Sequence, residues 1–412
     1  MNRTKISVLD VAKGLVNNEF VYHYQPKVSM ITGKLCGAEA LLRWPMRDGT
    51  LRTPANFISL AETTTLITDI AIAMFPKLTK DLADIHSADD SLQLSFNLSA
   101  KDFESSEMVD SIGNAVRSNL LDPKLLQVEI TETSIILNDN RLFRERLHSL
   151  HEMGIGLGMD DFGTGYSSIN MLSKWPFTTV KIDHELVQST QTNAKSRTIV
   201  ANSVTLAHQL GMNIVAEGIE SADLYEYLVK TGCTEGQGYW LGRPMPLPNY
   251  LDFIQKEHRW SGVPIGLIYM AKLEHLRWMQ VVTDEIINNA LDTEHGHEKG
   301  LTAQLDPTQC RLGQWYYGLG QEFKSFPAFD SLEAPHSRLH YIAGQLGDAV
   351  QRKVPHEQIL TLLHELTRQS NVVLGLLQDL ENDARFAKLR QGALSDRATI
   401  ALSSYKDVAD QR

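Results

Sequence analysis

Short apolar runs alternate with amphipathic stretches over the first 246 residues of the chain. Each run has the length of a buried strand, and most end in a polar residue before a helix-like stretch begins. The runs are residues 21–24, 37–42, 92–98, 126–130, 155–159, 179–182 and 213–216, and the helical patterns include 70–82, 106–120, 141–153 and 197–210. This alternation predicts an α/β fold with a parallel sheet, and its length suits a (β/α)8 barrel of the TIM type.

The alternation stops after Pro246, and the rest of the chain reads as helical. Helices are predicted over residues 267–291, 310–323, 331–352 and 355–380, with a polar loop over 292–300. Antiparallel helices with short connections predict an all-α four-helix bundle. We therefore expect a barrel over residues 1–256, the bundle over 262–383, and a polar tail over 384–412 that frays.

Composition and charge narrow the classes of function. The chain has 42% hydrophobic and 22% charged residues, and a net charge of −11 from 39 basic and 50 acidic residues. Such a balance offers no broad basic face for a nucleic acid polymer. Three cysteines are too few for a disulfide framework, and neither a signal peptide nor a membrane-spanning run is recognisable. A cytoplasmic chain that makes no membrane contact is expected.

Polar residues at or near the ends of the predicted strands are the candidate chemistry. In chain order they are Gln25, Glu39, Asn97, Glu129, Asp160 with Asp161, Lys181, Glu217 and Gln237. Any one of them is more often an ordinary cap or loop residue. On successive strands of a barrel, however, they would converge on one mouth, where barrel enzymes place their active sites.

The acids of this series predict a site for hard cations. Oxygen ligands without histidine or cysteine favour Mg²⁺ or Mn²⁺ over zinc. One cage would use Glu39, Asn97, Glu129 and Asp160, and a second cation would add Asp161 and Glu217. Two neighbouring cations suit in-line phosphodiester hydrolysis, in which Lys181 would orient the attacking water and Arg43 would contact a phosphate.

These motifs closely resemble the EAL domain of cyclic di-GMP phosphodiesterases, over residues 18–246. The matching motifs are Tyr24-Gln-Pro26, Glu39-Ala-Leu-Leu-Arg-Trp44, Asn97-Leu-Ser99, Glu129-Ile-Thr-Glu132, Asp160-Asp-Phe-Gly-Thr-Gly165, Lys181-Ile-Asp183, Ala216-Glu-Gly-Ile-Glu220 and Gln237-Gly-Tyr239. The resemblance implies a homodimeric barrel enzyme that hydrolyses cyclic di-GMP to linear 5'-pGpG with two Mg²⁺ or Mn²⁺ ions per active site.

The resemblance also implies roles for individual residues. Glu39, Asn97, Glu129, Asp160 and Asp161 match metal ligands, Glu217 matches a ligand of metal or water, and Lys181 matches a lysine at the nucleophilic water. Gln25, Leu41, Arg43 and Gln237 match positions of the substrate pocket. Glu132 matches the glutamate that holds the loop after Asp161, through which dimerisation is coupled to activity. Thr65 and Thr234 depart from common family residues, but neither is a metal ligand, so an active enzyme is expected.

The helical half carries a second set of possible metal ligands. His275 shares a predicted helical face with apolar residues, and His336 and His340 are four positions apart and so are neighbours on one face. Cys310 opens the segment Cys-Arg-Leu-Gly-Gln-Trp315. Each residue alone is more often an ordinary core or surface residue. Together, three imidazoles and one thiolate supply a closed tetrahedral zinc site.

This set resembles the chemoreceptor zinc-binding domain, a four-helix bundle with a histidine on its first helix, Cys-x-x-Gly-x-Trp on its second and His-x-x-x-His on its third. The resemblance implies one Zn²⁺ bound by His275, Cys310, His336 and His340, which regulates the attached phosphodiesterase. Three alternatives stay open: a purely structural zinc, redox sensing through Cys310, and a barrel that binds cyclic di-GMP as an effector without cleaving it.

Overall fold

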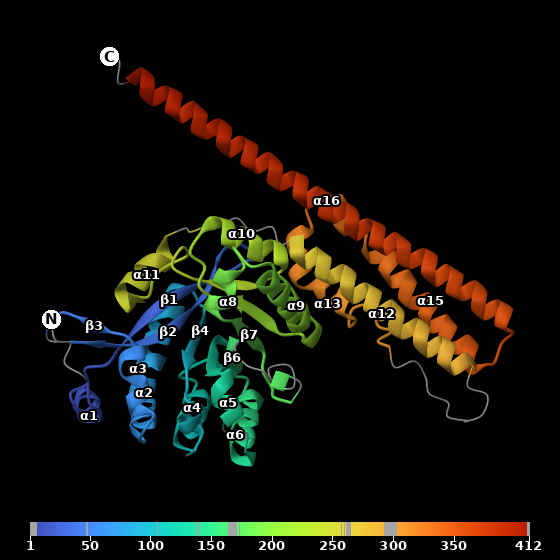
Figure 1. Ribbon diagram of the computed structural model, residues 1–412. Helices are drawn as coiled ribbons and strands as arrows, with labels where there is room; N and C mark the ends of the chain where they lie inside the picture. The colour runs from blue at the N-terminus through green and yellow to red at the C-terminus, as the bar shows by residue number, and fades with distance from the viewer. Residues whose placement is uncertain are drawn as a thin grey trace. The chain divides into compact units, whose positions relative to one another are not determined.

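The computed structural model divides the chain into two compact units, one up to residue 262 and one from residue 263 (Figure 1). It describes residues 6–46, 48–104, 106–137, 140–163, 171–172, 174–256, 258, 260, 265–291 and 303–409. The predicted loop over 292–300 and the segment 164–170 after Asp161 lie outside these residues. Among the helices described, none has the length and hydropathy that a bilayer crossing requires.

Eight strands close into a barrel in the first unit. In order around it they are β1 (Val21–Ser29), β9 (Glu235–Gln237), β8 (Asn213–Ala216), β7 (Thr179–Ile182), β6 (Gly156–Phe162), β5 (Leu126–Thr131), β4 (Gln93–Asn97) and β2 (Leu35–Pro45). β2 pairs with β1 again and closes the ring, which confirms the predicted barrel. Two short strands, β3 (Leu51–Arg52) and β10 (Met245–Pro246), pair with β2 and β1 outside the ring.

Helices surround the strands on the outside of the barrel (Figure 1). The α-helices are α1 (Val8–Val16), α2 (Ile58–Ala61), α3 (Leu66–Ala88), α4 (Glu107–Arg117), α5 (Glu132–Leu137), α6 (Arg141–Glu152), α8 (His184–Ser189), α9 (Ala194–Leu210), α10 (Ala222–Thr231) and α11 (Leu247–Gln255). The 3₁₀ turns are η1 (Pro54–Asn56), η2 (Ala100–Phe103) and η3 (Pro123–Leu125). On α3, Ile70, Met74, Leu78 and Leu82 are buried at a spacing of four residues, so one face of the helix packs inward.

Strand β1 is the exception to the predicted parallel sheet within the ring. It pairs antiparallel with β2 and with β9, whereas the other pairs around the ring are parallel. Only residues 30–34 separate β1 from β2, which is too short for the crossover of a dozen or more residues that parallel neighbours need. In the antiparallel register Gln25 lies opposite Glu39, so both residues lie within their strands and not at the ends.

The second unit is a helical bundle, as predicted. Its helices are α12 (Ile265–Leu291), α13 (Arg311–Tyr317), α14 (Pro327–Asp330), α15 (Glu333–Gln351) and α16 (His356–Ala409), with one 3₁₀ turn, η4 (Leu319–Phe323). The core between α12, α15 and α16 includes Val282, Ile286, Leu339, Ile342 and Leu366. The backbone of α16 is helical to Ala409, which includes most of the segment predicted as a polar tail from residue 384.

Candidate metal centres

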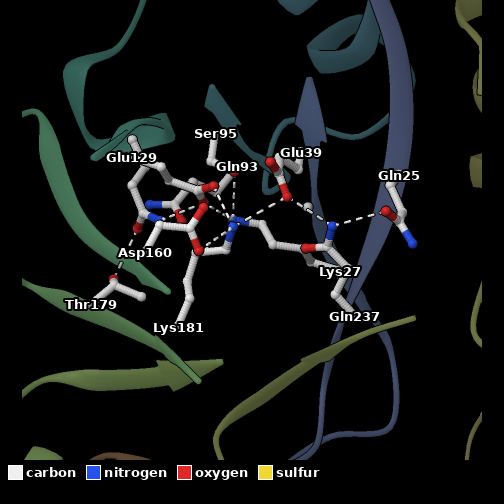
Figure 2. A network of polar contacts seen from close by, with 12 residues as sticks. Gln25, Lys27, Glu39, Gln93, Ser95, Glu129, Asp160, Thr179, Lys181 and Gln237 are labelled. Atoms are coloured by element: carbon white, nitrogen blue, oxygen red, sulfur yellow. Dashed lines mark hydrogen bonds and ion pairs between the residues drawn. The ribbon is translucent and has the colours of Figure 1, made fainter. Parts of the chain in front are cut away.

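Lys181 lies at the centre of four carboxylates at the mouth of the barrel (Figure 2). Its Nζ is 2.7 Å from Glu129 Oε2 and from Glu217 Oε1, and 3.2 Å from Glu39 Oε2 and from Asp160 Oδ1. The lysine side chain is 1% exposed. Strand closure therefore brings together five of the residues that the sequence predicts at one mouth.

Amide side chains hold Glu39 in place from both sides. Asn97 Nδ2 donates to Glu39 Oε1 at 2.6 Å, and Gln237 Nε2 donates to Glu39 Oε2 at 2.8 Å. Gln237 Nε2 is also 3.1 Å from Gln25 Oε1, and Gln25 Nε2 donates to the carbonyl oxygen of Gly242 at 3.2 Å. The predicted residues Gln25, Asn97 and Gln237 thus lie in the same network as the acids.

The charge of the cluster fits a divalent cation. Four carboxylates against the two ammonium groups of Lys181 and Lys27 leave two negative charges when all are ionised. Burial, with repulsion from neighbouring acids, raises the pKa of Asp160 well above its ordinary value and that of Glu217 to about 7. Protons on Asp160 and Glu217 therefore offset part of the negative charge of the cluster, and a divalent cation could neutralise that charge in their place. Oxygens of Glu39, Glu129 and Asp160 lie within 4.8 Å of one another, and such hard donors fit Mg²⁺ or Mn²⁺.

A deeper polar layer inside the barrel supports Glu129. Lys27 Nζ donates to Ser95 Oγ at 3.2 Å and is 3.9 Å from Glu129 Oε1. Gln127 Nε2 donates to the same glutamate oxygen at 3.1 Å, and Thr179 Oγ1 donates to Gln127 Oε1 at 2.8 Å (Figure 2). Burial acts to raise the pKa of Glu129, but Lys181 and Lys27 outweigh it and lower that pKa.

The sequence analysis missed this layer, although a signal for it was present. Each member is two positions from a predicted site residue on the same strand: Lys27 from Gln25, Ser95 from Asn97, Gln127 from Glu129, and Thr179 from Lys181. Because side chains two apart on a strand point to the same face, these polar residues share the barrel interior with the predicted ones.

Asp161 lies apart from the carboxylates around Lys181. A register shift between Met159 and Phe162, together with a φ of 58° at Asp161, takes this residue out of the regular strand alternation. Burial, followed by repulsion from Asp183, raises the pKa of Asp161. The structure brings Asp160 but not Asp161 into the cluster. A left-handed non-glycine residue costs free energy, and such residues concentrate at functional sites.

A cavity of about 410 Å³ opens beside the cluster. It is lined by Gln25, Glu39, Leu41, Asp160, Lys181, His184, Glu217, Gly218, Glu220, Gln237, Gly238 and Tyr239. Three of the four predicted substrate residues are in this lining. The fourth, Arg43, is buried and donates from its guanidinium to the carbonyl oxygen of Leu42 at 2.8 Å. Glu132 is fully buried at the start of α5, while much of the loop that it is predicted to hold lies outside the described residues.

Cys310, His336 and His340 converge in the second unit. The Nε2 atoms of the two histidines are 3.2 Å apart, and Cys310 Sγ is 3.3 Å from His336 Nε2. Zinc binds nitrogen at about 2.0–2.1 Å and sulfur at about 2.3 Å, so tetrahedral ligand atoms lie roughly 3.3–3.6 Å apart. The three side chains therefore fit zinc with little rearrangement.

The protonation states of the histidines also suit zinc, whereas burial raises the pKa of the Cys310 thiol, so that zinc binding must displace its proton. Burial lowers the pKa of His275 and His340 to about 4 and that of His336 to about 3, so all three are neutral at pH 7. His340 Nδ1 lies 3.0 Å from the carbonyl oxygen of Leu305, a contact that places the proton on Nδ1 and leaves Nε2 free for metal. Cys310 Sγ accepts the backbone N–H of Gly313 at 3.2 Å.

His275, the fourth predicted ligand, faces a different partner. Its side chain is buried, and its Nε2 is 2.8 Å from Ser370 Oγ of α16. The group of converging ligand atoms among the described residues contains Cys310, His336 and His340 without it. The structure thus assembles three of the four predicted ligands, and His275 must exchange Ser370 for the metal to complete the set.

Loss of a converging ligand is expected to empty the zinc site. The purified chain should carry one zinc ion, and Cys310→Ser or His336→Ala should reduce that content to less than about a tenth, because a structural zinc needs its full ligand set. Plasma mass spectrometry gives the zinc-to-protein ratio. His356→Ala, on the exposed start of α16, is the matched control and should keep its zinc. Full zinc content in both ligand variants would contradict the site.

Cation binding at the barrel mouth is expected to tighten as pH rises. Below about pH 7 Glu217 holds a proton that a cation must displace, whereas above it the carboxylate is ionised. The apparent Kd for Mn²⁺ should therefore fall by about fivefold from pH 6 to pH 7, by about tenfold from pH 6 to pH 8, and level off above that. Titration calorimetry in buffers of different ionisation enthalpy measures the released proton. In Glu217→Gln this proton release should become smaller, because the proton of Glu217 is gone; an unchanged release would show that the assignment to Glu217 is wrong.

Family models match both units of the chain. The EAL domain model matches residues 9–244, and the chemoreceptor zinc-binding domain model matches residues 275–346. Signaling protein YkoW of Bacillus subtilis is 37% identical over 242 residues, which cover 59% of this chain and 30% of YkoW. Cyclic di-GMP phosphodiesterase RocR of Pseudomonas aeruginosa is 36% identical over 247 residues, which cover 60% of this chain and 63% of RocR. The chain thus spans less than two thirds of either relative.

Solved structures match over a similar share of the chain. The PaMucR phosphodiesterase in complex with c-di-GMP superposes with a TM-score of 0.56 at 36% identity, covering 59% of this chain and 99% of that one. The EAL enzyme Bd1971, in its cAMP- and cyclic-di-GMP-bound form, gives a TM-score of 0.57 at 28% identity, covering 60% and 68%. With its barrel, its acid cluster and a family match over more than half its length, the chain belongs to the EAL domain family and carries a chemoreceptor zinc-binding domain after the barrel.

Proposed function

We propose that the barrel unit is a cyclic-guanylate-specific phosphodiesterase that hydrolyses cyclic di-GMP to linear 5'-pGpG. The observation that carries the proposal is the cluster of four carboxylates around Lys181, whose excess negative charge calls for a divalent cation. The name of RocR and the c-di-GMP in the PaMucR complex support the choice of substrate.

Some residues of the cluster would bind metal, and Lys181 would position the attacking water. Two Mg²⁺ or Mn²⁺ ions would supply water activation and stabilise the attacking and leaving oxygens. Glu39, Asn97, Glu129 and Asp160 would hold one ion, and Asp161 and Glu217 would serve the other. Asp161 is not in the converging group of Glu39, Glu129 and Asp160, and Asp183 is the acid that raises its pKa most, which supports a separate role. Lys181 would hold the water by hydrogen bonds and offset developing charge.

Residues around the acids would bind the dinucleotide. Gln25 and Gln237 present amide groups beside Glu39, where they can bond to phosphate oxygens or to a base. Leu41 offers an apolar wall of the same cavity. Arg43 would exchange the carbonyl oxygen of Leu42 for a phosphate, which its fork of N–H donors can grip with two bonds. Glu132 would fix the loop that follows Asp161.

Removal of one cage charge is expected to abolish turnover. Glu39→Gln keeps the shape of the side chain but loses an anionic ligand, so kcat should fall by at least about 100-fold. Chromatography of cyclic di-GMP and pGpG after incubation with Mn²⁺ measures the rate. Glu104→Gln, an exposed position outside the barrel mouth, is the matched control. Binding of cyclic di-GMP by the wild-type chain without any pGpG would instead favour the silent effector.

We also propose that zinc bound by His275, Cys310, His336 and His340 regulates this activity. The support is the combination of a preformed three-ligand cluster with a catalytic barrel in one chain. The free cysteines Cys36, Cys233 and Cys310 accord with a reducing cytoplasm, and a homodimer is the assembly in which we expect the chain to act.

Zinc is expected to change the hydrolysis rate only when its ligands are intact. In saturating Mg²⁺, the wild-type chain stripped by chelator and then refilled with zinc should differ in rate by about fivefold or more between the two states. Cys310→Ala should show one rate under both conditions, and His356→Ala should behave as wild type. If the stripped and refilled wild-type chains hydrolyse at equal rates, zinc does not regulate the activity and its role is structural.

A further inference from the structure

A row of six uncharged side chains, four of them exposed and two half-buried, runs along one face of α12. Its members are Tyr269, Leu273, Leu276, Gln280, Thr283 and Ile287, which we call the α12 seam. Tyr269, Leu276 and Ile287 are 51%, 48% and 44% exposed. Single exposed apolar residues are ordinary, but these six recur at alternating spacings of four and three residues, which is the period of a coiled-coil interface. The row is about 27 Å long at 1.5 Å per residue.

The remaining face of α12 is already used inside the bundle. His275, Val282 and Ile286 are buried against the other helices. Lys272, at the border between the two faces, pairs with Glu381 of α16 at 2.5 Å. The Thr283 hydroxyl donates to the carbonyl oxygen of Met279 at 2.8 Å, so its polar atom is satisfied within the helix. The seam is thus a second apolar face that the described bundle leaves uncovered.

Charges beside the seam point to another copy of the same helix. Arg277 and Asp284 are both exposed on one flank, seven residues apart, and Arg277 also acts electrostatically on Glu274 of its own helix. In an antiparallel pair this flank faces its own copy, so Arg277 lies opposite Asp284 of the partner subunit, and Asp284 lies opposite Arg277 of the partner subunit. A parallel pair would place Arg277 toward Lys272 of the partner subunit, where like charges repel.

The same two-fold axis produces matched layers across the seam. Leu276 meets Ile287 of the partner subunit, and Gln280 meets Thr283 of the partner subunit. Two apolar layers therefore enclose a polar centre, and a polar residue in such an interface fixes the register at some cost in stability. The seam is thus complementary to a second copy of itself, both in its side-chain layers and in its flanking charges. Such self-complementarity is what a two-fold dimer requires.

We propose that the α12 seam is a self-association surface through which two chains pair in antiparallel orientation. The proposal deepens the homodimer of the proposed function by naming its surface, and it requires no hydrolysis of cyclic di-GMP. His275, which is buried on another face of α12, is one of the proposed zinc ligands, so that ligand and the interface belong to the same helix.

The molar mass of the full chain tests the proposal. Light scattering after size exclusion should give about twice the chain mass of 46.2 kDa at micromolar concentration. Leu276→Arg places a charge in an apolar layer and should raise the dimer Kd by at least about tenfold. Leu360→Arg, at a leucine that is 56% exposed on α16 outside the seam, is the matched control and should stay dimeric. Circular dichroism and the Tm establish that each variant is folded.

A charge exchange tests the antiparallel register. Arg277→Glu alone and Asp284→Arg alone should each weaken the dimer, because each creates like charges across the flank. The two changes together should restore the wild-type Kd. A monomeric wild-type chain, or an unchanged dimer in Leu276→Arg, would overturn the surface, and failure of the double variant to recover would overturn the register. A dimer that cleaves no cyclic di-GMP contradicts only the proposed enzyme, and an active monomer contradicts only the seam.

Discussion

The ion pairs between Lys181 and four carboxylates are the interaction on which the barrel mouth depends. A buried ammonium is costly unless it is paired, and clustered carboxylates repel unless cations separate them. The buried lysine therefore requires the carboxylates, and the carboxylates require the lysine. All of them meet only because the strands close into a barrel. The pairing is incomplete in charge, because the acids outnumber the lysines by two even with Lys27 included. That imbalance is the physical basis for the cation site that we propose at the mouth.

Much of this site could be predicted from sequence, because strand ends in a barrel share one mouth. This reasoning placed Glu129, Asp160 and Lys181 together, and the structure confirms their contacts. It predicted a parallel sheet, whereas β1 pairs antiparallel with β2. The predicted runs 21–24 and 37–42 leave twelve residues between them, and only the longer strands of the structure shorten this connection to five residues, too few for a parallel crossover. The position of Asp161 could not be predicted from the sequence, because tertiary structure imposes its left-handed backbone conformation, which is uncommon for a residue other than glycine.

In the helical unit, too, contacts within one helix could be predicted from the sequence, whereas contacts between distant helices could not. The spacing of His336 and His340 fixes their proximity on one helix, so that pair was predictable. The contact of His275 with Ser370 joins residues 95 positions apart, and no periodicity in either helix predicts it. Burial then sets the chemistry: it keeps all three histidines neutral, which is the form that binds metal. The fold thus prepares soft ligands in one unit and hard oxygen ligands in the other.

A crystal of the full chain grown with Mn²⁺ and zinc, with anomalous scattering recorded at both absorption edges, would locate the cations of both units in one structure. The account predicts manganese between Glu39, Asn97, Glu129 and Asp160, with a second manganese on the side of Asp161 and Glu217. It predicts zinc at Cys310, His336 and His340, with His275 turned from Ser370 to the metal. A barrel mouth without manganese, in which Lys181 keeps all four carboxylate contacts, would contradict the account.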